Sequence, residues 1–484
     1  MHAPWTAAKK GQHVMKHMSL AKITSACHGI YRGDSENAAK EVSSVTIDSR
    51  KIEKDSLFIA IKGARSDGHD FIPQTIENGA LCALSEKDLG DVPYPYILVE
   101  SCKQALKDLA EHYRRSLNIK VVGITGSVGK TSTKEMVASV LSQKYRVLKT
   151  AGNFNNEIGL PLTVFNIREE HEIAVLEMGI SDFGEMARLA KVARPDICIF
   201  TNIGYSHLEQ LKSRDGILKA KTEMLQFMNP KGSILFNGDD DKLNTFIPEN
   251  GIRPVYFGLG ENCPYRAGHV ENKGLHGTTA EFITPATRFT AHISIPGSHM
   301  VNNALAGTAA GFLLGLTKEE VKAGIEALVP LDGRDHIIET GKFTIIDDCY
   351  NANPGSMKAS LDVLAQADTR TIAVLGDMGE LGDGWKEMHR QVGKHAAVCK
   401  IQLIVCIGEM AAEIEKGASA AAKEQAEQQI PKPEAGQPAT VLHYDTKEDF
   451  FANMETVLKP GDTILVKASH MMGFSEIVEK LQTL

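Results

Sequence analysis

The amino-acid sequence predicts an α/β protein of three domains. Its 484 residues exceed the length of one or two ordinary domains. Apolar strand-like runs alternate with amphipathic helical stretches, which is typical of parallel sheets covered on both faces. A glycine-rich segment at residues 123–132 lies between one such strand and the following helix, as a phosphate-binding loop does. These observations favour three α/β domains, the middle of which binds a phosphate group.

The first domain is expected at residues 18–113, after a loose extension at residues 1–17. Short strand-like runs at 44–47, 57–61 and 96–99 alternate with small helices. This pattern predicts a small α/β module.

The middle domain is expected at residues 114–330. Strands of continuous hydrophobicity are expected at 121–124, 174–177, 197–202 and 233–237, with amphipathic helices between them. Such strands predict a parallel sheet whose carboxyl edge carries the ligand site.

The third domain is expected at residues 331–484, with strands at 344–348, 371–376, 401–408 and 463–467. Their alternation with helices predicts a second open sheet of Rossmann type.

The Ala/Glu/Lys/Gln-rich stretch at 412–440 contains three prolines near its end. It predicts a helix that runs into a mobile surface loop, and we expect no catalytic or binding residue there.

Composition excludes several classes of protein. The net charge is −8 and no long run of like charges occurs, so nucleic acid is not an expected partner. No signal-peptide pattern and no run of eighteen apolar residues is found, so we expect no membrane span. Eight scattered cysteines without a C-x-x-C pair indicate reduced thiols. We expect a cytoplasmic monomer.

The glycine-rich segment is the strongest functional signal. Its glycines let backbone N–H groups surround an anion at a helix N-terminus, where the helix dipole adds to the attraction. A lysine provides a mobile ammonium, and a hydroxyl can bind Mg²⁺. The expected ATP and Mg²⁺ ligands are Gly126, Ser127, Gly129, Lys130, Thr131 and Ser132. Ile124 stands where the strict P-loop has its first glycine, which indicates a shortened loop.

Three further residues follow strands or helices of the middle domain and are candidates for a magnesium site. Glu177 ends an apolar strand, as a Walker-B acid does, and the alternative is a solvated carboxylate at the sheet edge. His207 follows the next strand, and the alternative is a structural histidine. Lys221 lies in a predicted helix, where the alternative is a solvated face residue.

These motifs, in this order, resemble the central ATPase domain of the Mur ligases. The resemblance rests on residues 125–131, 152–161, 177–179, 206–209 and 220–223. It implies that Lys221 is carbamylated and helps to organise magnesium, and that Glu177 and His207 act around a second magnesium ion. A carbamate makes physical sense there because a free ammonium would repel the cation.

Later motifs extend the resemblance. Asn303 matches the asparagine that reads the adenine ring, although a helix-capping role is equally open from the sequence. Arg334 matches a linker arginine that reaches the γ-phosphate, which suits its planar charged fork. Asp348 matches an acid that contacts the ribose, and Tyr350 lies near the nucleotide.

The strings at 347–354 and 375–382 are similar to the family member that adds D-alanyl-D-alanine to UDP-N-acetylmuramoyl-tripeptide. The Asp-Asn-Pro-Arg signature of the sibling that adds a diamino acid is absent. Residues 48–50 resemble the uridine-nucleotide module that both siblings share. The implied substrate residues are Asp48, Ser49, Arg50, Asn155, Asn156, Asn351, Asn353, Lys467 and Ser469.

One position departs from the family pattern. The last-strand motif usually reads Lys-Gly-Ser-Arg, whereas this chain has His470 in the place of the arginine. An always-charged fork is thereby replaced by a group that is mostly neutral near pH 7, so an anion contact is not carried over to this position.

The resemblance implies an ATP-dependent amide ligase of peptidoglycan precursor synthesis that works through an acyl phosphate. Lys130, Lys221, His207 and Arg334 are the expected catalytic residues. Two alternatives stay open: a P-loop ATPase that serves as a regulatory module, and the diamino-acid-adding sibling.

Overall fold

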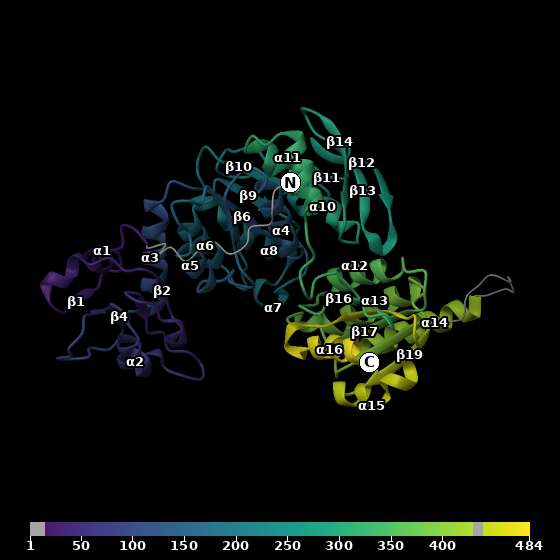
Figure 1. Cartoon of the computed structure of the whole chain (residues 1–484). Helices are drawn as coiled ribbons and strands as arrows, with labels where there is room; N and C mark the ends of the chain where they lie inside the picture. Colours follow the sequence, from purple (N-terminus) through teal and green to yellow (C-terminus); the bar gives the residue numbers. More distant parts are fainter. Residues whose placement is uncertain (1–14, 429–438) are drawn as a thin grey trace.

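The structure is a computed structural model that describes residues 15–428 and 439–484. Figure 1 shows three α/β bodies in chain order, from the purple N-terminal body through the blue and teal middle body to the green and yellow C-terminal body. Each body has its own sheet among the described residues. The predicted fold class is confirmed. The boundaries drawn between the domains stay predictions.

The N-terminal sheet has the strand order β1-β5-β4-β3-β2, and only β1 runs antiparallel to its neighbour. Helix α3 joins this domain to the next, because it packs against α1 on one side and against α5 and α6 of the middle domain on the other. The elements are α1 (Leu20–Ala26), β1 (Ile30–Arg32), β2 (Val45–Thr46), β3 (Leu57–Ile59), α2 (Ile72–Glu77), β4 (Cys82–Ser85), β5 (Tyr96–Leu98) and α3 (Cys102–Ser116).

The predicted N-terminal extension falls largely outside the described residues, which begin at Met15. That side chain is fully buried and its N–H donates to the Ser43 carbonyl at 3.2 Å. Lys16 forms an ion pair with Glu169 at 2.6 Å. The packed module therefore starts before residue 18.

The middle sheet has the order β14-β13-β12-β11-β10-β9-β6-β8-β7. The strands from β7 to β12 are parallel, as predicted, and an antiparallel hairpin pair, β13 and β14, extends the sheet at one edge. The strands are β6 (Lys120–Thr125), β7 (Val147–Lys149), β8 (Ile173–Glu177), β9 (Ile197–Phe200), β10 (Ser233–Asn237), β11 (Val255–Gly258), β12 (Tyr265–Asn272), β13 (Thr278–Ile283) and β14 (Arg288–Ile293). The helices are α4 (Lys130–Leu141), α5 (Gly159–Val164), α6 (Glu185–Ala193), α7 (Leu208–Leu211), α8 (Arg214–Thr222), α9 (Asp241–Thr245), α10 (His299–Leu313) and α11 (Lys318–Glu326).

The C-terminal sheet has the order β15-β16-β20-β17-β18-β19 and is parallel except at β15. Helices α12, α13 and α14 cover one face, and α15 and α16 cover the other, so each face has its own apolar core. The elements are β15 (His336–Glu339), β16 (Thr344–Asp347), α12 (Pro354–Leu364), β17 (Thr371–Gly376), α13 (Trp385–Val398), β18 (Leu403–Ile407), α14 (Ala412–Gln428), β19 (Thr440–Tyr444), α15 (Lys447–Val457), β20 (Thr463–Lys467) and α16 (Ser475–Thr483). The surface loop predicted after α14 lies outside the described residues.

Besides the connecting chain, the middle and C-terminal domains meet at several places among the described residues. The tip between β12 and β13 forms a 3₁₀ helix, η5 (Gly274–His276), whose Leu275 packs against the C-terminal core beside α12. Another contact lies between α7 and the 3₁₀ helix η6 (Gly382–Gly384). The two domains are thus in contact through elements that are far apart in the sequence.

Helix α4, which follows the glycine-rich loop, is held by close packing against α10 and α11. A Cβ atom added at Gly324 of α11 would lie 2.3 Å from the Cα atom of Val140. The Ser139 hydroxyl donates to the Gly324 carbonyl at 2.6 Å, which fixes the same crossing point. Only glycine allows this approach.

We therefore predict that Gly324→Ala lowers the free energy of unfolding by about 1–3 kcal/mol, because a methyl group forces the two backbones apart. Urea unfolding followed by circular dichroism measures this change. Lys322→Ala, on the exposed side of the same helix, is the control and should change stability by less than about 0.5 kcal/mol. Equal midpoints for the two variants would contradict the packing argument.

Candidate active site

A cleft of about 1050 Å³ lies between the middle and C-terminal domains. It is formed by the glycine-rich loop, the carboxyl ends of β8, β9 and β10, the start of α10, and the loop between β16 and α12. This is the edge of an open parallel sheet at which ligands bind. The predicted residues that line it are Ser127, Gly129, Lys130, Thr131, Ser132, Asn155, Asn156, Glu177, His207, Asn303, Arg334, Asp348, Tyr350, Asn351, Asn353 and Lys467.

The glycine-rich loop is fixed against the residues that directly follow strand β9. A Cβ atom at Gly126 would lie 1.9 Å from the Thr201 hydroxyl oxygen, and Gly129 has a φ of 79°. The Val128 N–H donates to the Asn202 side-chain oxygen at 3.0 Å, and the Thr201 hydroxyl donates to the Val128 carbonyl at 2.6 Å. Contacts with Thr201 and Asn202 therefore help to hold the loop in the shape that an anion requires.

Lys130 begins helix α4 and folds over the loop. Its Nζ donates to the Gly126 carbonyl at 2.9 Å and to the Ser127 carbonyl at 3.3 Å. Burial lowers the pKa of Lys130, and the nearby Glu177 carboxylate acts in the opposite direction. The ammonium is therefore poised beside the loop, where a phosphate would meet it.

Glu177 is buried at the carboxyl end of β8, so the solvated alternative for this residue is wrong. The Thr131 hydroxyl donates to one carboxylate oxygen at 2.9 Å, and the Asn155 amide donates to the other at 2.8 Å. Lys134, which sequence reasoning missed, is also buried and places its Nζ 3.9 Å from the same carboxylate. A hydroxyl and a carboxylate brought together in this way are the oxygen ligands that Mg²⁺ prefers.

Lys221 is fully buried in α8, so the alternative of a solvated helix residue is wrong. Burial lowers its pKa well below the ordinary value, and the charge on Lys130 lowers it further. No hydrogen bond or ion pair of its Nζ is found within residues 15–428 and 439–484. A lowered pKa favours the neutral amine, which is the form that reacts with carbon dioxide to give a carbamate. The residue itself does not line the cleft.

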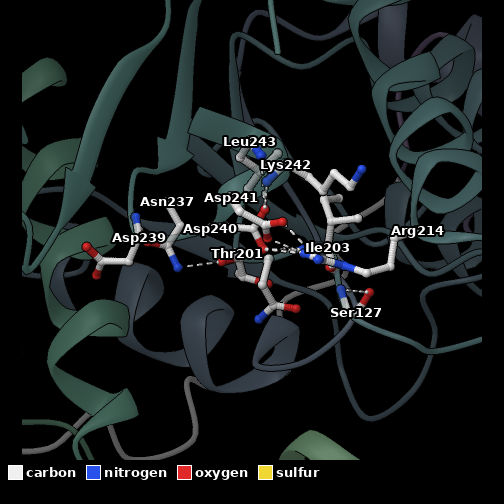
Figure 2. A network of polar contacts seen from close by, with 12 residues as sticks. Ser127, Thr201, Ile203, Arg214, Asn237, Asp239, Asp240, Asp241, Lys242 and Leu243 are labelled. Carbon is white, nitrogen blue, oxygen red and sulfur yellow. Dashed lines mark hydrogen bonds and ion pairs between the residues drawn. The ribbon is translucent and has the colours of Figure 1, made fainter. Parts of the chain in front are cut away.

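The loop after β9 is held by the polar network in Figure 2. Asp240 accepts a hydrogen bond from the Ile203 N–H at 2.8 Å and caps α9 with its other oxygen. Arg214 donates to the Ile203 carbonyl at 2.8 Å and forms an ion pair with Asp241. Asn237 donates to the Thr201 carbonyl at 2.9 Å. These contacts from β10, α8 and α9 position the chain that leads to His207.

His207 meets the C-terminal domain. Its Nδ1 lies 2.8 Å from a carboxylate oxygen of Glu380, in the loop before η6. The His207 imidazole holds the pKa of Glu380 below its usual range. The predicted magnesium residue is therefore also a point of contact between domains.

On the C-terminal side, Asp348 and Lys467 form a buried ion pair. The Ser360 hydroxyl donates to Asp348 at 2.5 Å, and Lys467 also donates to the Asn351 carbonyl at 3.2 Å. Burial raises the pKa of Asp348 to about 6, although the Lys467 ammonium opposes this shift. Lys467 thus neutralises Asp348, and its predicted contact with a substrate stays a prediction.

Arg334 and Tyr350 face each other across the start of the third domain. The guanidinium carbon lies 4.1 Å from the centre of the tyrosine ring, a cation–π contact. Next to it, the Nε2 of His299 lies 3.2 Å from Asp335, and one oxygen of Asp335 is buried without a hydrogen-bond partner. Sequence reasoning missed His299 and Asp335, although His299 belongs to the same motif as Asn303.

The predicted asparagines play different structural parts. Asn303 lies inside α10, so the capping alternative is wrong, and its oxygen accepts from the Thr133 hydroxyl at 2.8 Å. Asn353 caps α12 in a capping box, and Asn156 accepts from the Gly159 N–H at 2.9 Å at the start of α5. Asn351 is exposed and accepts from the His470 N–H at 3.3 Å.

The remaining predicted substrate residues are not brought into this cleft. Ser469 is buried beside Asn351, at 3.4 Å. Asp48 caps the 3₁₀ helix η2 (Ser49–Lys51) in the N-terminal domain and pairs with the exposed Arg50 at 2.9 Å. Arg50 holds the pKa of Asp48 down, to about 2. A uridine-nucleotide role for residues 48–50 therefore stays a prediction.

Comparisons with known proteins agree with this architecture. Three family models match the chain: the Mur ligase family catalytic domain at residues 41–114, the Mur ligase middle domain at 124–311, and the Mur ligase glutamate ligase domain at 333–470. The UDP-N-acetylmuramoyl-tripeptide–D-alanyl-D-alanine ligase of Bacillus subtilis is 37% identical over 91% of this chain and 93% of its own length. This chain belongs to the Mur ligase family.

Other members of the family are similar over nearly the whole chain. The ligase of the same name from Escherichia coli is 32% identical over 96% of this chain and 98% of its own length. A crystal structure of MurF from Acinetobacter baumannii has a TM-score of 0.86 at 30% identity and covers 96% of this chain and 99% of its own. MurF ligase from Thermotoga maritima in complex with ADP has a TM-score of 0.79 at 29% identity, covering 91% and 97%.

We predict that Lys130→Ala nearly abolishes ATP-dependent turnover and leaves the fold intact, because among the described residues the hydrogen bonds of its ammonium go to carbonyl groups of the loop itself. Phosphate release and the urea midpoint measure the two effects. Lys144→Ala, an exposed lysine on the same domain, is the matched control and should retain activity. Full activity of Lys130→Ala would rule out the phosphate-loop assignment.

Proposed function

We propose that this chain is the ATP-dependent ligase that joins D-alanyl-D-alanine to UDP-N-acetylmuramoyl-tripeptide in peptidoglycan precursor synthesis. The relatives from Bacillus subtilis and Escherichia coli carry this activity in their names. The observation that carries the proposal is the cleft itself, in which a phosphate loop and a Thr131–Glu177 oxygen pair face the arginine of the following domain. We also propose that the protein is cytoplasmic, because all eight cysteines are free thiols, as expected in a reducing compartment. A monomer is proposed with it, and size-exclusion chromatography tests that state.

The reaction needs an activated carboxylate. The terminal carboxylate of the tripeptide attacks the γ-phosphorus of ATP, an oxygen–phosphorus bond forms, and the bond to ADP breaks. The amine of the dipeptide then attacks the acyl carbon, inorganic phosphate leaves, and the amine loses a proton. Phosphate is a far better leaving group than the oxygen of a free carboxylate. The acyl phosphate therefore retains part of the free energy of ATP hydrolysis and uses it to form the amide bond.

The residues of the cleft support these steps by electrostatics and positioning. Lys130 would bind the phosphate oxygens beside the loop. Arg334 would move away from the Tyr350 ring, and its guanidinium would stabilise the negative charge of the transferred phosphoryl group. Thr131 and Glu177 would hold Mg²⁺, which neutralises phosphate charge when bound. Carbamylated Lys221 would supply a further carboxylate. The buried Asp348–Lys467 pair would orient the ribose.

Two alternatives are tested by the same measurement. A regulatory P-loop ATPase would hydrolyse ATP without an amine or a uridine nucleotide. The sibling enzyme would release phosphate with meso-diaminopimelate or lysine and the UDP-muramoyl dipeptide.

Within the described residues no helix is long and apolar enough to cross a membrane.

We predict that phosphate release depends on both D-alanyl-D-alanine and UDP-N-acetylmuramoyl-tripeptide. The assay is a matrix of UDP-muramoyl peptides against amino acids and dipeptides, with coupled phosphate detection and mass spectrometry of the product. The single-substrate wells are the internal controls. Turnover only with the UDP-muramoyl dipeptide and a diamino acid would overturn the assignment in favour of the sibling.

We predict that Lys221→Ala is inactive and is partly rescued by acetate or formate. The reason is that Lys221 is buried and its pKa is lowered, so the side chain carries a negative charge only as a carbamate. In the variant a small carboxylate can replace that negative charge. Phosphate release against carboxylate concentration measures the rescue, with chloride at equal ionic strength as the control. The exposed Lys219→Ala, two residues away, should remain active. Undiminished activity of Lys221→Ala would remove the carbamate from the mechanism.

We predict that His470→Arg holds or improves the apparent affinity for the dipeptide. His470 is exposed, and its ring lies 5.4 Å from that of Tyr350 at the rim of the cleft. A permanent positive charge there would attract the carboxylate of the dipeptide. The KM for D-alanyl-D-alanine measures this change, and a higher KM with unchanged KM for ATP would show that position 470 does not face the anion.

A further inference from the structure

Three different metal-binding side chains meet on the C-terminal domain, away from the cleft. Asp362 lies in the last turn of α12, His395 lies in the last turn of α13, and Cys399 is the C-cap residue of α13. One ligand atom from each lies within 4.8 Å of those of the other two. None of the three lines the cleft.

We propose that Asp362, His395 and Cys399 form a site for a divalent transition-metal ion of the Zn²⁺ class, with a fourth position open to water. The site is separate from the magnesium centre of the cleft and does not depend on the proposed reaction.

The backbone arranges these ligands before any ion binds. His395 and Cys399 are four residues apart at the end of one helix, so their side chains lie on the same face. Helix α12 packs beside α13 and brings Asp362 to that face. The His395 Nε2 lies 2.7 Å from one carboxylate oxygen of Asp362, and the Cys399 sulfur lies 3.4 Å from the same oxygen.

These separations are close to those of a tetrahedral metal site. With Zn–N and Zn–O bonds of about 2.0–2.2 Å and a Zn–S bond of about 2.3 Å, neighbouring ligand atoms are about 3.3–3.6 Å apart. The sulfur–oxygen distance already agrees, and the histidine–aspartate contact has to open by about 0.6–0.9 Å. The side chain of Asp362 is 58% exposed and that of His395 is 28% exposed, so rotation of the side chains is sufficient.

The helix ends favour a cation. All three residues lie at the carboxyl ends of α12 and α13, where unpaired carbonyl groups carry partial negative charge. Two such ends and one carboxylate converge on the same point. The positive charge of an ion at this point would therefore be stabilised by the backbone as well as by its ligands.

The donor set selects the kind of ion. Nitrogen, sulfur and oxygen ligands together suit Zn²⁺ or Co²⁺, whereas Mg²⁺ requires oxygen ligands and retains its water. The thiol gives up its proton when the metal binds, as protein thiols do. Millimolar Mg²⁺ in an assay would consequently leave this site free for Zn²⁺.

The position of α12 gives the site a consequence for the cleft. Asn353, the N-cap residue of this helix, and Ser360 within it line the cleft, and Asp362 follows Ser360 within the next turn. An ion that ties α12 to α13 therefore restrains the helix that forms one wall of the nucleotide site.

The test is a Co²⁺ titration of the full-length, reduced protein in the presence of excess Mg²⁺, which occupies oxygen sites. We expect intense tetrahedral d–d bands and a sulfur-to-cobalt charge-transfer band that saturate at one equivalent, and Zn²⁺ should displace the cobalt. Cys399→Ser should lose the charge-transfer band. Asp362→Asn, a change at an exposed side chain, should weaken binding without affecting folding.

Cys27→Ser, at the C-cap of α1 in the first domain, is the matched control and should keep the full spectrum. A wild-type protein without the sulfur band, or a Cys399→Ser variant that retains it, would overturn the proposal. Weak octahedral bands alone would show that cobalt binds only to oxygen ligands elsewhere, which also overturns it.

Alkylation provides a second readout. All eight cysteines lie in the described residues, and Cys399 is the one that is not buried. Iodoacetamide should therefore modify Cys399 first in the native protein, and one equivalent of Zn²⁺ should slow that reaction as followed by peptide mass spectrometry. Equal rates with and without Zn²⁺ would contradict the site.

Discussion

The buried carboxylate of Glu177 is the constraint on which the active cleft depends. A carboxylate inside a protein is stable only if hydrogen bonds or cations replace its water. Here Thr131 from the loop helix, Asn155 from the loop after β7 and Lys134 from α4 all converge on it. One charge at the end of β8 therefore joins two separate pieces of chain, helix α4 and the loop after β7, and the contact with α4 helps to position the phosphate loop that precedes this helix.

On the opposite wall of the cleft the buried group is a cation, and acceptor oxygens stabilise it. There the ammonium of Lys467 is buried at the end of β20, and Asp348, at the end of β16, compensates it together with the Asn351 carbonyl. Both walls therefore present polar groups that the protein has already desolvated and oriented. Such preorganisation lets a charged ligand enter without rebuilding the site, because the surrounding dipoles are already aligned.

Much of this arrangement could be predicted from the sequence, because continuous apolar strands leave a strong local signal. The strands β10, β17 and β20 have the predicted bounds. The hairpin β13–β14 was missed because its alternating burial is a weaker pattern. The pairing of Lys467 with Asp348 and the contact of His207 with Glu380 join residues more than a hundred positions apart, and no local pattern reports such contacts. Whether Lys221 is buried or exposed depends on how α8 packs against other helices, so the sequence alone could not decide between the two.

The apolar tip at Leu275 limits how the C-terminal domain can move. The domain is attached to the middle domain by the chain near Arg334 and by Leu275, which is seated in its core beside α12. The contact between α7 and η6, where His207 meets Glu380, is a further attachment. Each attachment removes some of the freedom with which the C-terminal domain could rotate against the middle domain. The position of Arg334 relative to the phosphate loop therefore depends on residues that lie far from the loop itself.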